Sequence, residues 1–283
     1  MRFIKLAGGL GNLLFQYAFG QYIGKKHCSE VKYFIGEDPV PGYSALVKLV
    51  GNIPLATDDQ LKAVGYKFYN SLHFRLVHKL LLWFPWLSRR KMVEVGSSFK
   101  AEIAPTYTVF DGYWQSYKYI DKDFAAQINW AKHITDNPYA EDIRRENSVF
   151  LHIRRGDYLK IKGLYHQCSI DYFKKGAEII SQKVDNPTFF IFSNDIAWVK
   201  SNLNLEGYKV VFVENTGENS DLKDLYCMAN CKHGVIANST FSWWAGYLIS
   251  SPNKIIIAPK QWYETEAMNK ETTNLIPTDW LRI

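Results

Sequence analysis

Apolar and polar positions follow two alternating rhythms along this chain, and the pattern is clearest after residue 148. Short apolar runs of strand length are followed there by longer segments whose apolar residues have helical spacing. Strands separated by helices of this length form right-handed βαβ units, so we expect an α/β fold with a parallel sheet. The predicted strands are Val149–Ile153, Thr188–Phe192, Lys209–Val213, Gly234–Ala237 and Lys254–Ala258, and the predicted helices between them are Ile170–Ser181, Ile196–Leu203, Asp221–Ala229 and Phe241–Leu248.

The start of the chain shows the same rhythm. We predict a strand at Phe3–Leu6, a tight glycine-containing loop at Ala7–Asn12, a helix at Leu14–Lys26 and a further strand at Val31–Ile35. Residues 40–110 are less regular, and their pattern assigns no elements.

Composition narrows the classes of protein that remain. A chain of 283 residues has room for one large domain or two medium ones, and 47% hydrophobic with 22% charged residues is typical of a globular protein. The net charge of +6 suits an anionic ligand or an anionic membrane surface, but it is too small and dispersed to indicate nucleic-acid binding. The 16% aromatic content suits sugar-binding clefts, although such side chains more often form the core.

The cysteines and the N-terminal residues indicate the cellular compartment in which the protein is expected. Cys227 and Cys231 lie four residues apart on a predicted helix with His233 nearby, which is a weak zinc pattern, and we interpret them as buried free thiols. No disulfide framework is visible, so we expect a reducing compartment. The chain starts directly in a strand without a signal region, and no stretch has the length of a membrane span. We therefore expect a cytoplasmic protein, either soluble or peripherally bound to a membrane.

The stretch His152–Tyr158 places two arginines at the end of a predicted buried strand. Ligands of open α/β sheets bind at the carboxyl ends of strands. The guanidinium groups of Arg154 and Arg155 can each grip phosphate oxygens through two parallel hydrogen bonds, so the pair indicates a diphosphate site. The alternative is a structural cluster of ion pairs in which Asp157 neutralises one arginine.

Two other segments join a predicted strand to a predicted helix. The glycines of Gly8–Asn12 allow the backbone to approach a ligand, and the following helix N-terminus favours an anion. This is not the dinucleotide-binding fingerprint, whose third glycine would fall at Leu14. Asn238, Ser239 and Thr240 stand at another helix start, where they either cap the helix or hold phosphate oxygens.

Together these segments resemble the bacterial α-1,2-fucosyltransferases of glycosyltransferase family 11. Leu13 and Asn194 depart from the family pattern, which usually has Gln and a second acidic residue there. The H-x-R-R-G-D element is shared more loosely with α-1,6- and protein O-fucosyltransferases, so it indicates GDP-fucose better than it indicates linkage. The similar segments run in family order from the first strand to about residue 263, and they are Gly8–Asn12 with Phe15–Ala18, Gly112–Ser116, His152–Tyr158, Phe192–Trp198 and Asn238–Trp244.

The resemblance implies a GT-B type α/β fold, in which two Rossmann-like domains with parallel sheets face each other across a cleft. We place the acceptor-side domain at residues 1–140 and the GDP-sugar-binding domain at residues 141–283. The implied reaction is an inverting transfer of L-fucose from GDP-β-L-fucose to a hydroxyl, O2 of a terminal β-galactose. The acceptor would be an oligosaccharide or lipid-linked glycan such as an O-antigen or capsule repeat. No cofactor and no metal are expected, because arginine side chains can neutralise the departing diphosphate.

The implied chemistry gives roles to individual residues. Arg154, with Arg155 in support, is expected to neutralise the charge on the β-phosphate. Asp157 is a candidate general base that could equally hold the arginines in place, and His166 is a weaker candidate. Asp224 is expected to accept hydrogen bonds from guanine N1–H and N2–H. Arg154 and Asp157 are thus predicted as catalytic, and the predicted donor-binding residues are Gly11, Asn12, His152, Arg154, Arg155, Asp224, Asn238, Ser239, Thr240 and Phe241.

Three alternatives stay open. Asp121 and Asp123 have the D-x-D spacing of metal-dependent glycosyltransferases, but a helix N-cap is the favoured interpretation. The donor could be another GDP-linked deoxyhexose. A carbohydrate-binding protein without catalysis would also be rich in aromatic residues, although it would have no diphosphate for the arginine pair to neutralise.

Residues 73–91 set a short aromatic and aliphatic run between basic clusters. The run is too short to cross a bilayer, and Pro85 would interrupt a helix there. Trp and cationic side chains favour the headgroup boundary, so one interpretation is a peripheral contact with the inner membrane leaflet. The other is that the run packs between the two domains.

Overall fold

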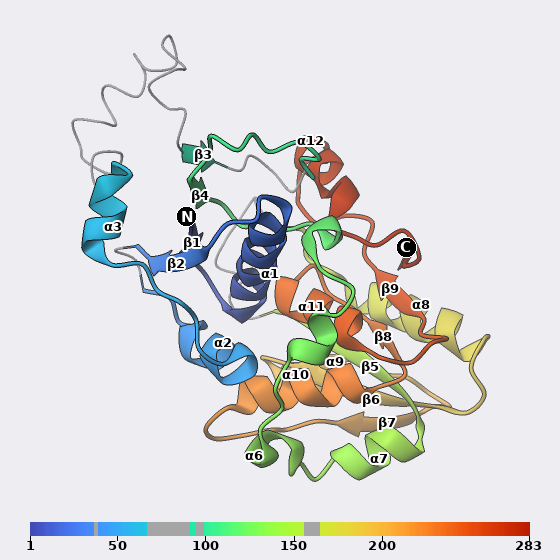
Figure 1. The fold of residues 1–283 in the computed structure, drawn as a ribbon. Helices are drawn as coiled ribbons and strands as arrows, with labels where there is room; N and C mark the ends of the chain where they lie inside the picture. Colours follow the sequence, from blue (N-terminus) through green and yellow to red (C-terminus); the bar gives the residue numbers. More distant parts are fainter. Residues whose placement is uncertain (37–38, 67–90, 94–98, 156–164) are drawn as a thin grey trace. The chain divides into compact units, whose positions relative to one another are not determined.

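The computed structural model describes residues 1–36, 39–66, 91–93, 99–155 and 165–283 (Figure 1). The chain divides into two compact units, Met1–Ile128 and Asn129–Ile283. The short helix α6 (Lys132–Thr135) therefore belongs to the C-terminal unit. The domain boundary expected from the sequence lies later, after residue 140. The roles expected for the two halves stay predictions.

The N-terminal unit contains a parallel sheet in the order β2-β1-β4-β3. Its central strands are therefore β1 and β4, which pair through Phe3 with Val109 and Ile4 with Phe110. Two helices, α2 and α3, and the strands β3 and β4 fall in the segment that the sequence pattern left unassigned. The strands are β1 (Arg2–Leu6), β2 (Val31–Ile35), β3 (Lys91–Val93) and β4 (Val109–Asp111), and the helical segments are α1 (Leu10–Lys26), α2 (Tyr43–Val50), α3 (Asp58–Ala63), η2 (Tyr117–Tyr119) and η3 (Phe124–Gln127).

The helix α1 begins four residues earlier than the sequence pattern predicts. The backbone N–H groups of Asn12 and Leu13 both donate to the Gly9 carbonyl, so the expected loop is already helical at Leu10. Burial explains the early start, because Leu10 and Leu13 both lie in the core. Gly11 and Asn12 consequently lie in the first turn of the helix.

The C-terminal unit contains a six-stranded sheet in the order β10-β9-β8-β5-β6-β7, with every pair parallel. The central strand β5 pairs with β6 from Asn147–Pro187 to Ile153–Ser193, and all of its residues after Asn147 are buried. Such burial on both faces explains the continuous apolar runs in the sequence. The strands are β5 (Asn147–Ile153), β6 (Pro187–Ser193), β7 (Lys209–Phe212), β8 (His233–Val235), β9 (Ile256–Ala258) and β10 (Leu281–Arg282).

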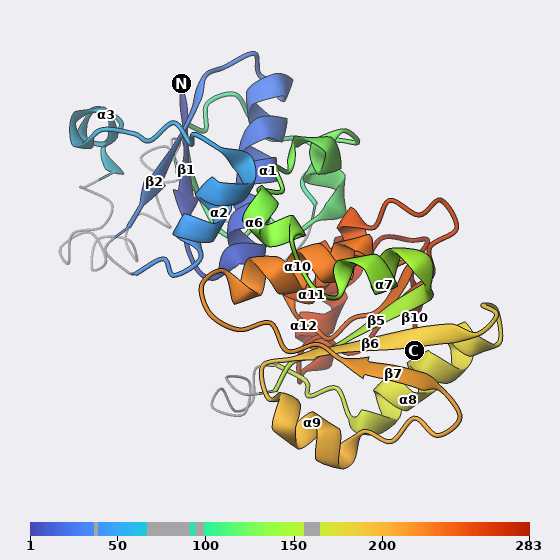
Figure 2. The same ribbon diagram turned by 90° about the horizontal axis from the view of Figure 1, so that it is seen from below.

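The helices of this unit cover both faces of the sheet. Figure 2 shows α8 and α9 on one face and α10 and α11 on the other. Gly176 lets α8 approach β8 closely, because a Cβ at that position would lie 2.8 Å from Val235 Cγ1. The four helices predicted here are confirmed, that at Ile170–Ser181 with the same bounds. The helical segments are α6 (Lys132–Thr135), α7 (Ala140–Arg145), α8 (Ile170–Ser181), α9 (Ile196–Asn202), α10 (Ser220–Asn230), α11 (Thr240–Leu248), α12 (Glu266–Lys270) and η5 (Glu271–Asn274).

The side on which the chain adds new strands to the C-terminal sheet changes once, at a reversal point between β5 and β8, although all the strands stay parallel. From β5 the chain adds β6 and β7 on one side, and from β8 it adds β9 and β10 on the other. The connections that leave the neighbouring strands β5 and β8 therefore run to opposite sides of the sheet. In a doubly wound α/β sheet the crevice outside the carboxyl ends of two such strands is the place where ligands bind.

Candidate active site

Two of the segments singled out in the sequence meet at this reversal point between β5 and β8. Arg154 and Arg155 directly follow β5, and both side chains are half-buried. The strand β8 leads through Asn238 and Ser239 into α11. The ring centroids of His152 and Phe241 lie 5.6 Å apart, so the arginine segment and the start of α11 are in contact. The predicted donor-binding residues on both segments therefore share one edge of the sheet.

The start of α11 has the features of an anion site. Ser239 occupies the N-cap position, but its side chain makes no capping hydrogen bond. The Ser242 hydroxyl instead accepts a hydrogen bond of 3.0 Å from the Ala237 backbone N–H and ties the turn to the end of β8. A helix N-terminus carries a partial positive charge and exposes N–H donors to an anion. Ser242 lies within the segment Asn238–Trp244, but its supporting role was not predicted from the sequence.

Asn238 is a buried junction between three segments, with 1% of its surface exposed. Its amide nitrogen donates to the backbone carbonyls of His166, at 2.5 Å, and Trp262, at 2.8 Å. The Cys168 thiol lies 3.6 Å from its amide oxygen, and burial raises the pKa of that thiol to about 12, so it is a neutral donor. Asn238 thus holds the loops around the site in place, and a direct contact with a donor stays a prediction.

A cavity of about 440 Å³ lies beside these loops in the C-terminal unit. It shares His166 and Cys168 with the Asn238 junction, and its volume is in the range of small-molecule sites. Lys175 and Lys260 add positive charge to its lining. The cavity therefore suits a polar or anionic group next to the ends of β9 and β10.

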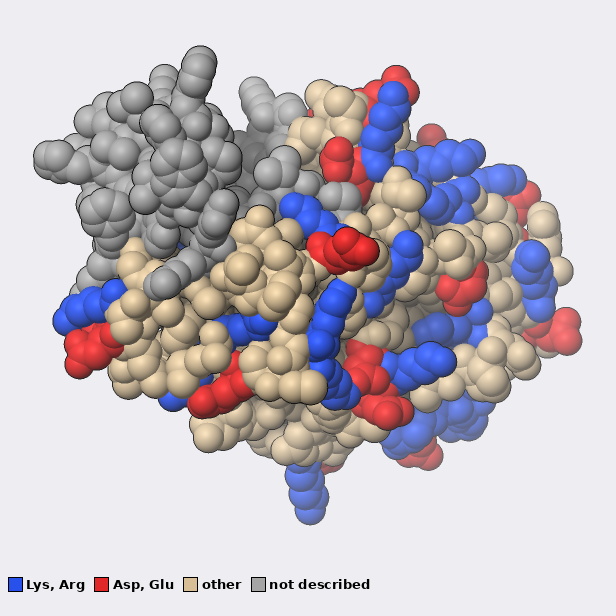
Figure 3. Space-filling view, turned by 45° about the horizontal axis from the view of Figure 1, so that its top comes forward, with Lys and Arg blue, Asp and Glu red and all other residues tan. Residues whose placement is uncertain are grey.

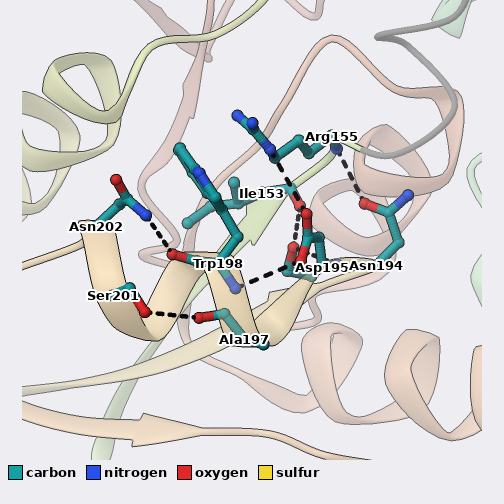
Figure 4. A network of polar contacts seen from close by, with 9 residues as sticks. Ile153, Arg155, Asn194, Asp195, Ala197, Trp198, Ser201 and Asn202 are labelled. Carbon is teal, nitrogen blue, oxygen red and sulfur yellow. Dashed lines mark hydrogen bonds and ion pairs between the residues drawn. The ribbon is translucent and has the colours of Figure 1, made fainter.

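Arg155 is held by side chains that follow the neighbouring strand β6 (Figure 4). Its backbone N–H donates to Asn194 Oδ1 at 2.9 Å, and its Nε lies 3.6 Å from Asp195 Oδ2. The guanidinium carbon lies 3.7 Å from the centre of the Trp198 ring, which is a close cation–π contact. The alternative of an ion pair at the arginine motif is thus observed for Arg155, with Asp195 as its partner. The predicted residue Asp157 lies outside the described residues.

The same network joins the ends of β5 and β6. The Ser193 hydroxyl donates to the Ile153 carbonyl at 2.7 Å and accepts from the Asp195 backbone N–H at 3.0 Å. Asp195 also caps α9 by accepting from the Trp198 backbone N–H at 3.4 Å. The turn that carries Arg154 is therefore fixed to the neighbouring strand. Sequence reasoning missed this role of Ser193, Asp195 and Trp198, although their segment was quoted for its resemblance.

Asp224 lies on α10 in a chain of side-chain hydrogen bonds. Its Oδ1 accepts a bond of 2.8 Å from Asn215 Nδ2, and Asn215 Oδ1 accepts one of 2.8 Å from Asn137 Nδ2. Burial raises the pKa of Asp224 to about 6, against the opposing effect of the Asn215 hydrogen bond. A carboxylate whose charge is disfavoured by its surroundings is a candidate for ligand binding. Its expected contact with guanine stays a prediction.

In the N-terminal unit, two glutamines organise the carboxyl ends of β1 and β4. Gln16 accepts from the Ala7 backbone N–H at 3.0 Å and donates to the Gly112 carbonyl at 2.9 Å. Gln115 donates to Asn12 Oδ1 at 3.0 Å. Asn12 thus has a partner within its own unit, and the structure places Gly11 beside it in the first turn of α1. The donor-binding roles predicted for Gly11 and Asn12 stay predictions.

The D-x-D tripeptide, residues 121–123, directly precedes the 3-10 helix η3, as the capping interpretation predicts. Asp123 is at the N-cap position of η3 and makes no side-chain capping bond. Asp121 forms an ion pair with Lys25 and accepts from the Asp123 backbone N–H at 3.5 Å. The N-cap position is thus confirmed, while the side-chain contacts of the tripeptide are made by Asp121. Across the described ranges, no three His, Cys, Asp or Glu side chains come together as a metal-binding group.

Cys227 and Cys231 are buried and free, which confirms their interpretation as core thiols.

None of the helices in the described part of the chain is both long and apolar enough to cross a bilayer. On the face shown in Figure 3, basic and acidic side chains are interspersed and form no single basic surface. The run at residues 73–91 falls almost wholly outside the described residues, which resume at Lys91.

Comparisons with known proteins agree with the motifs. Residues 89–283 match the family described as glycosyl transferase family 11. The chain is 31% identical to an alpha-1,2-colitosyltransferase of Escherichia coli, over 99% of this chain and 97% of that protein. It is 27% identical to the O-antigen biosynthesis glycosyltransferase WbnK of Escherichia coli, over 94% of this chain and 96% of that protein.

The fold is similar to that of a solved glycosyltransferase. The NodZ alpha-1,6-fucosyltransferase from Bradyrhizobium, in a crystal soaked with GDP-fucose, matches with a TM-score of 0.54 and 14% identity, over 90% of this chain and 94% of that chain. This likeness concerns the fold, which is α/β with parallel sheets and of the GT-B type. The family match and the full-length relative together show that the chain is an enzyme and belongs to glycosyltransferase family 11.

Proposed function

We propose that this enzyme transfers a 6-deoxy-L-hexose, L-fucose or a close analogue, from its GDP-linked form to a sugar hydroxyl of an O-antigen or capsule glycan. The observation that carries the proposal is the contact between His152 and Phe241, whose ring centroids lie 5.6 Å apart. That contact brings the end of β5, with its two arginines, to the N-terminus of α11. Two sources of positive charge thus lie at the reversal point of the sheet, where a nucleotide sugar would bind.

The diphosphate is the leaving group of the proposed reaction. As the bond between the sugar and the β-phosphate lengthens, negative charge builds up on the phosphate oxygens. Arg154 and the N–H groups at the start of α11 would stabilise that charge without a metal ion. Ser193 and Asp195 hold the turn that follows β5, so the arginine would be positioned before the substrate arrives.

The acceptor hydroxyl would attack from the face opposite the diphosphate, so the configuration at the anomeric carbon would invert. We propose O2 of a terminal β-galactose as this hydroxyl and Asp157 as the base that removes its proton. His166 is the second candidate for the base. Its backbone carbonyl is held by Asn238, which fixes the loop from which its side chain extends.

A second candidate donor is favoured by the alpha-1,2-colitosyltransferase relative, which is 31% identical over 99% of this chain. Colitose is L-fucose without its 3-hydroxyl group. A site that hydrogen-bonds this hydroxyl would reject the deoxy sugar strongly, because buried polar groups would lose their partners. A site lined by apolar atoms at that position would discriminate only weakly between the two sugars.

A panel of donors and acceptors tests the proposal. The enzyme is incubated with GDP-L-fucose, GDP-L-colitose and GDP-mannose, each with β-galactosides and with α-galactosides, and products are read by mass. We expect transfer of one or both 6-deoxy sugars to β-galactosides, with NMR showing an α-1,2 linkage. Transfer of mannose alone, or no transfer and no donor hydrolysis from any GDP-sugar, would reject the proposal.

We further propose that the enzyme works at the inner face of the plasma membrane, where a lipid-linked glycan would be its acceptor. The support is the composition of residues 73–91, in which basic residues flank an apolar run that contains Trp83 and Trp86. Such a segment would keep the enzyme near its acceptor without crossing the bilayer.

A further inference from the structure

Tyr113 is an exposed aromatic residue in a segment that is otherwise buried. Its exposed fraction is 45%, whereas Trp114 and Ser116 are fully buried and Gln115 is 8% exposed. Among the described residues, it is the aromatic member of the group of exposed large hydrophobic side chains. It follows β4 by two positions, so it lies at the carboxyl edge of the N-terminal sheet.

The segment on both sides of Tyr113 is held by the start of α1, on one side through a backbone carbonyl and on the other through a side chain. The Gly112 carbonyl accepts from Gln16 at 2.9 Å, and Gln115 donates to Asn12 at 3.0 Å. These bonds join the loop after β4 to the first turns of α1. The exposed ring is thus carried on a fixed loop, and it needs little ordering when a ligand arrives.

The next residue, Trp114, has a left-handed backbone with φ of +54°. This conformation is uncommon for a bulky residue and persists only where the surroundings hold it. The Trp114 ring stacks on Phe19 with centroids 4.1 Å apart and an interplanar angle of 7°. The buried tryptophan therefore anchors an unfavourable turn whose neighbour, Tyr113, is left in solvent.

We propose that Tyr113 is a stacking platform for a pyranose ring of the acceptor glycan, an inference that rests on the proposed function. Aromatic rings bind sugars through the apolar C–H face of the pyranose. The Tyr side chain suits such a ligand, because it has an apolar ring face and a polar hydroxyl group, and a sugar has both apolar C–H groups and hydroxyl groups. The proposed ligands of the leaving phosphate, Arg154 and the start of α11, belong to the C-terminal unit, whereas Tyr113 belongs to the N-terminal unit and is uncharged. A neutral aromatic platform fits a glycan better than a nucleoside diphosphate.

The test compares Tyr113→Ala, Tyr113→Phe and the control Leu55→Ala. Leu55 is 46% exposed, in the same unit as Tyr113. Initial rates are measured against acceptor and donor separately, together with donor hydrolysis without acceptor. Tyr113→Ala should raise the acceptor KM about tenfold, since a stacked aromatic contact is of that strength, and should leave donor KM and hydrolysis within about twofold. Tyr113→Phe and Leu55→Ala should match the wild type.

Several results would overturn the assignment. An unchanged acceptor KM in Tyr113→Ala would exclude the platform, and an equal rise in donor KM would assign the ring to the donor instead. A loss in Tyr113→Phe as large as in Tyr113→Ala would indicate a hydrogen bond from the hydroxyl. If the wild type neither transfers nor hydrolyses any GDP-sugar, the proposed function fails by itself. Saturation-transfer NMR with β-galactosides would then still decide, because Tyr113→Ala should bind them about tenfold more weakly than the wild type, and equal binding would exclude the platform.

Discussion

The guanidinium carbon of Arg155 lies 3.7 Å from the centre of the Trp198 ring, while its Nε lies 3.6 Å from Asp195 Oδ2. One face of the guanidinium is therefore covered by an indole, and its charge is partly balanced by a carboxylate. These contacts are made by residues that follow β6, so they connect two neighbouring strand ends. Arg155 thus helps to fix the turn, and its predicted contact with the donor stays a prediction, while Arg154 is the proposed phosphate ligand.

Replacing Arg154 should abolish transfer in a folded protein. Loss of a charged donor to the leaving phosphate is expected to lower kcat on the order of a hundredfold or more in Arg154→Ala. Arg154→Lys should also be poor, because a single ammonium cannot reproduce the two parallel hydrogen bonds. Initial rates and the far-ultraviolet circular dichroism spectrum are measured together. Near-normal turnover in a well-folded variant would remove Arg154 from the mechanism.

Replacing Trp198 should show whether Arg155 acts by positioning. In Trp198→Leu the cation–π contact is lost, which should lower the free energy of unfolding by about 1 kcal/mol. The donor KM should rise severalfold, because the turn after β5 is less ordered, while the effect on kcat stays smaller than that of Arg154→Ala. Ser201→Ala on the same helix, which removes an exposed bond to the Ala197 carbonyl, is the matched control. Identical kinetics in Trp198→Leu and Ser201→Ala would contradict the positioning role.

Activity should survive removal of divalent cations. Arg154 and the N-terminus of α11 are proposed to supply the positive charge that a metal provides in other glycosyltransferases. Rates are measured after dialysis against EDTA and again after adding Mg²⁺ or Mn²⁺. Complete loss with chelator and recovery with metal would return Asp121 and Asp123 to consideration as ligands, and Asp123→Asn would then be tested first.

The ionised carboxylate of Asp224 should lower the free energy of unfolding at neutral pH. Its folded pKa of about 6 lies above its ordinary value of 3.8, so the folded protein binds more protons between these pH values. Stability therefore falls as pH rises through this window and is constant above it. Asp224→Asn should raise the free energy of unfolding on the order of 1–2 kcal/mol at pH 8 and change it little at pH 4. Denaturant titrations at both pH values measure this.

The same variant tests the proposed guanine contact. An amide cannot accept from guanine N1–H and N2–H as a carboxylate does, so GDP affinity should fall about tenfold in Asp224→Asn. Calorimetric titration with GDP and with ADP separates this from a general loss of binding. A variant that is stabilised at pH 8 yet binds GDP as tightly as the wild type would leave Asp224 as a buried structural carboxyl.

Membrane association should depend on the tryptophans of the run at residues 73–91. We expect the wild type to float with vesicles that contain anionic lipids, and Trp83→Ser/Trp86→Ser to remain in the lower fractions. Vesicles of zwitterionic lipid alone are the control for the basic clusters. A wild type that does not float, or a double variant that floats equally well, would exclude this contact.

Local patterns in the sequence determined much of the C-terminal unit. The helix at Ile170–Ser181 was predicted with its observed bounds, because an amphipathic helix and a doubly buried strand each leave a periodic signature within a few residues. The strand-end location of Arg154 follows from the same signature. The described part of residues 40–110 lacks it, since β3 and β4 are three residues long and α2 and α3 are short.

Only the tertiary structure decided which distant residues meet. Asp195 pairs with Arg155 across 40 positions, Gln16 reaches Gly112 across 96, and Lys25 holds Asp121 across the same separation. The order of the strands, and hence the meeting of β5 with β8, is likewise absent from local periodicity. The physical reason is that spacing within an element reports which face is buried, whereas long-range pairing depends on how whole elements pack, which no short stretch of sequence encodes.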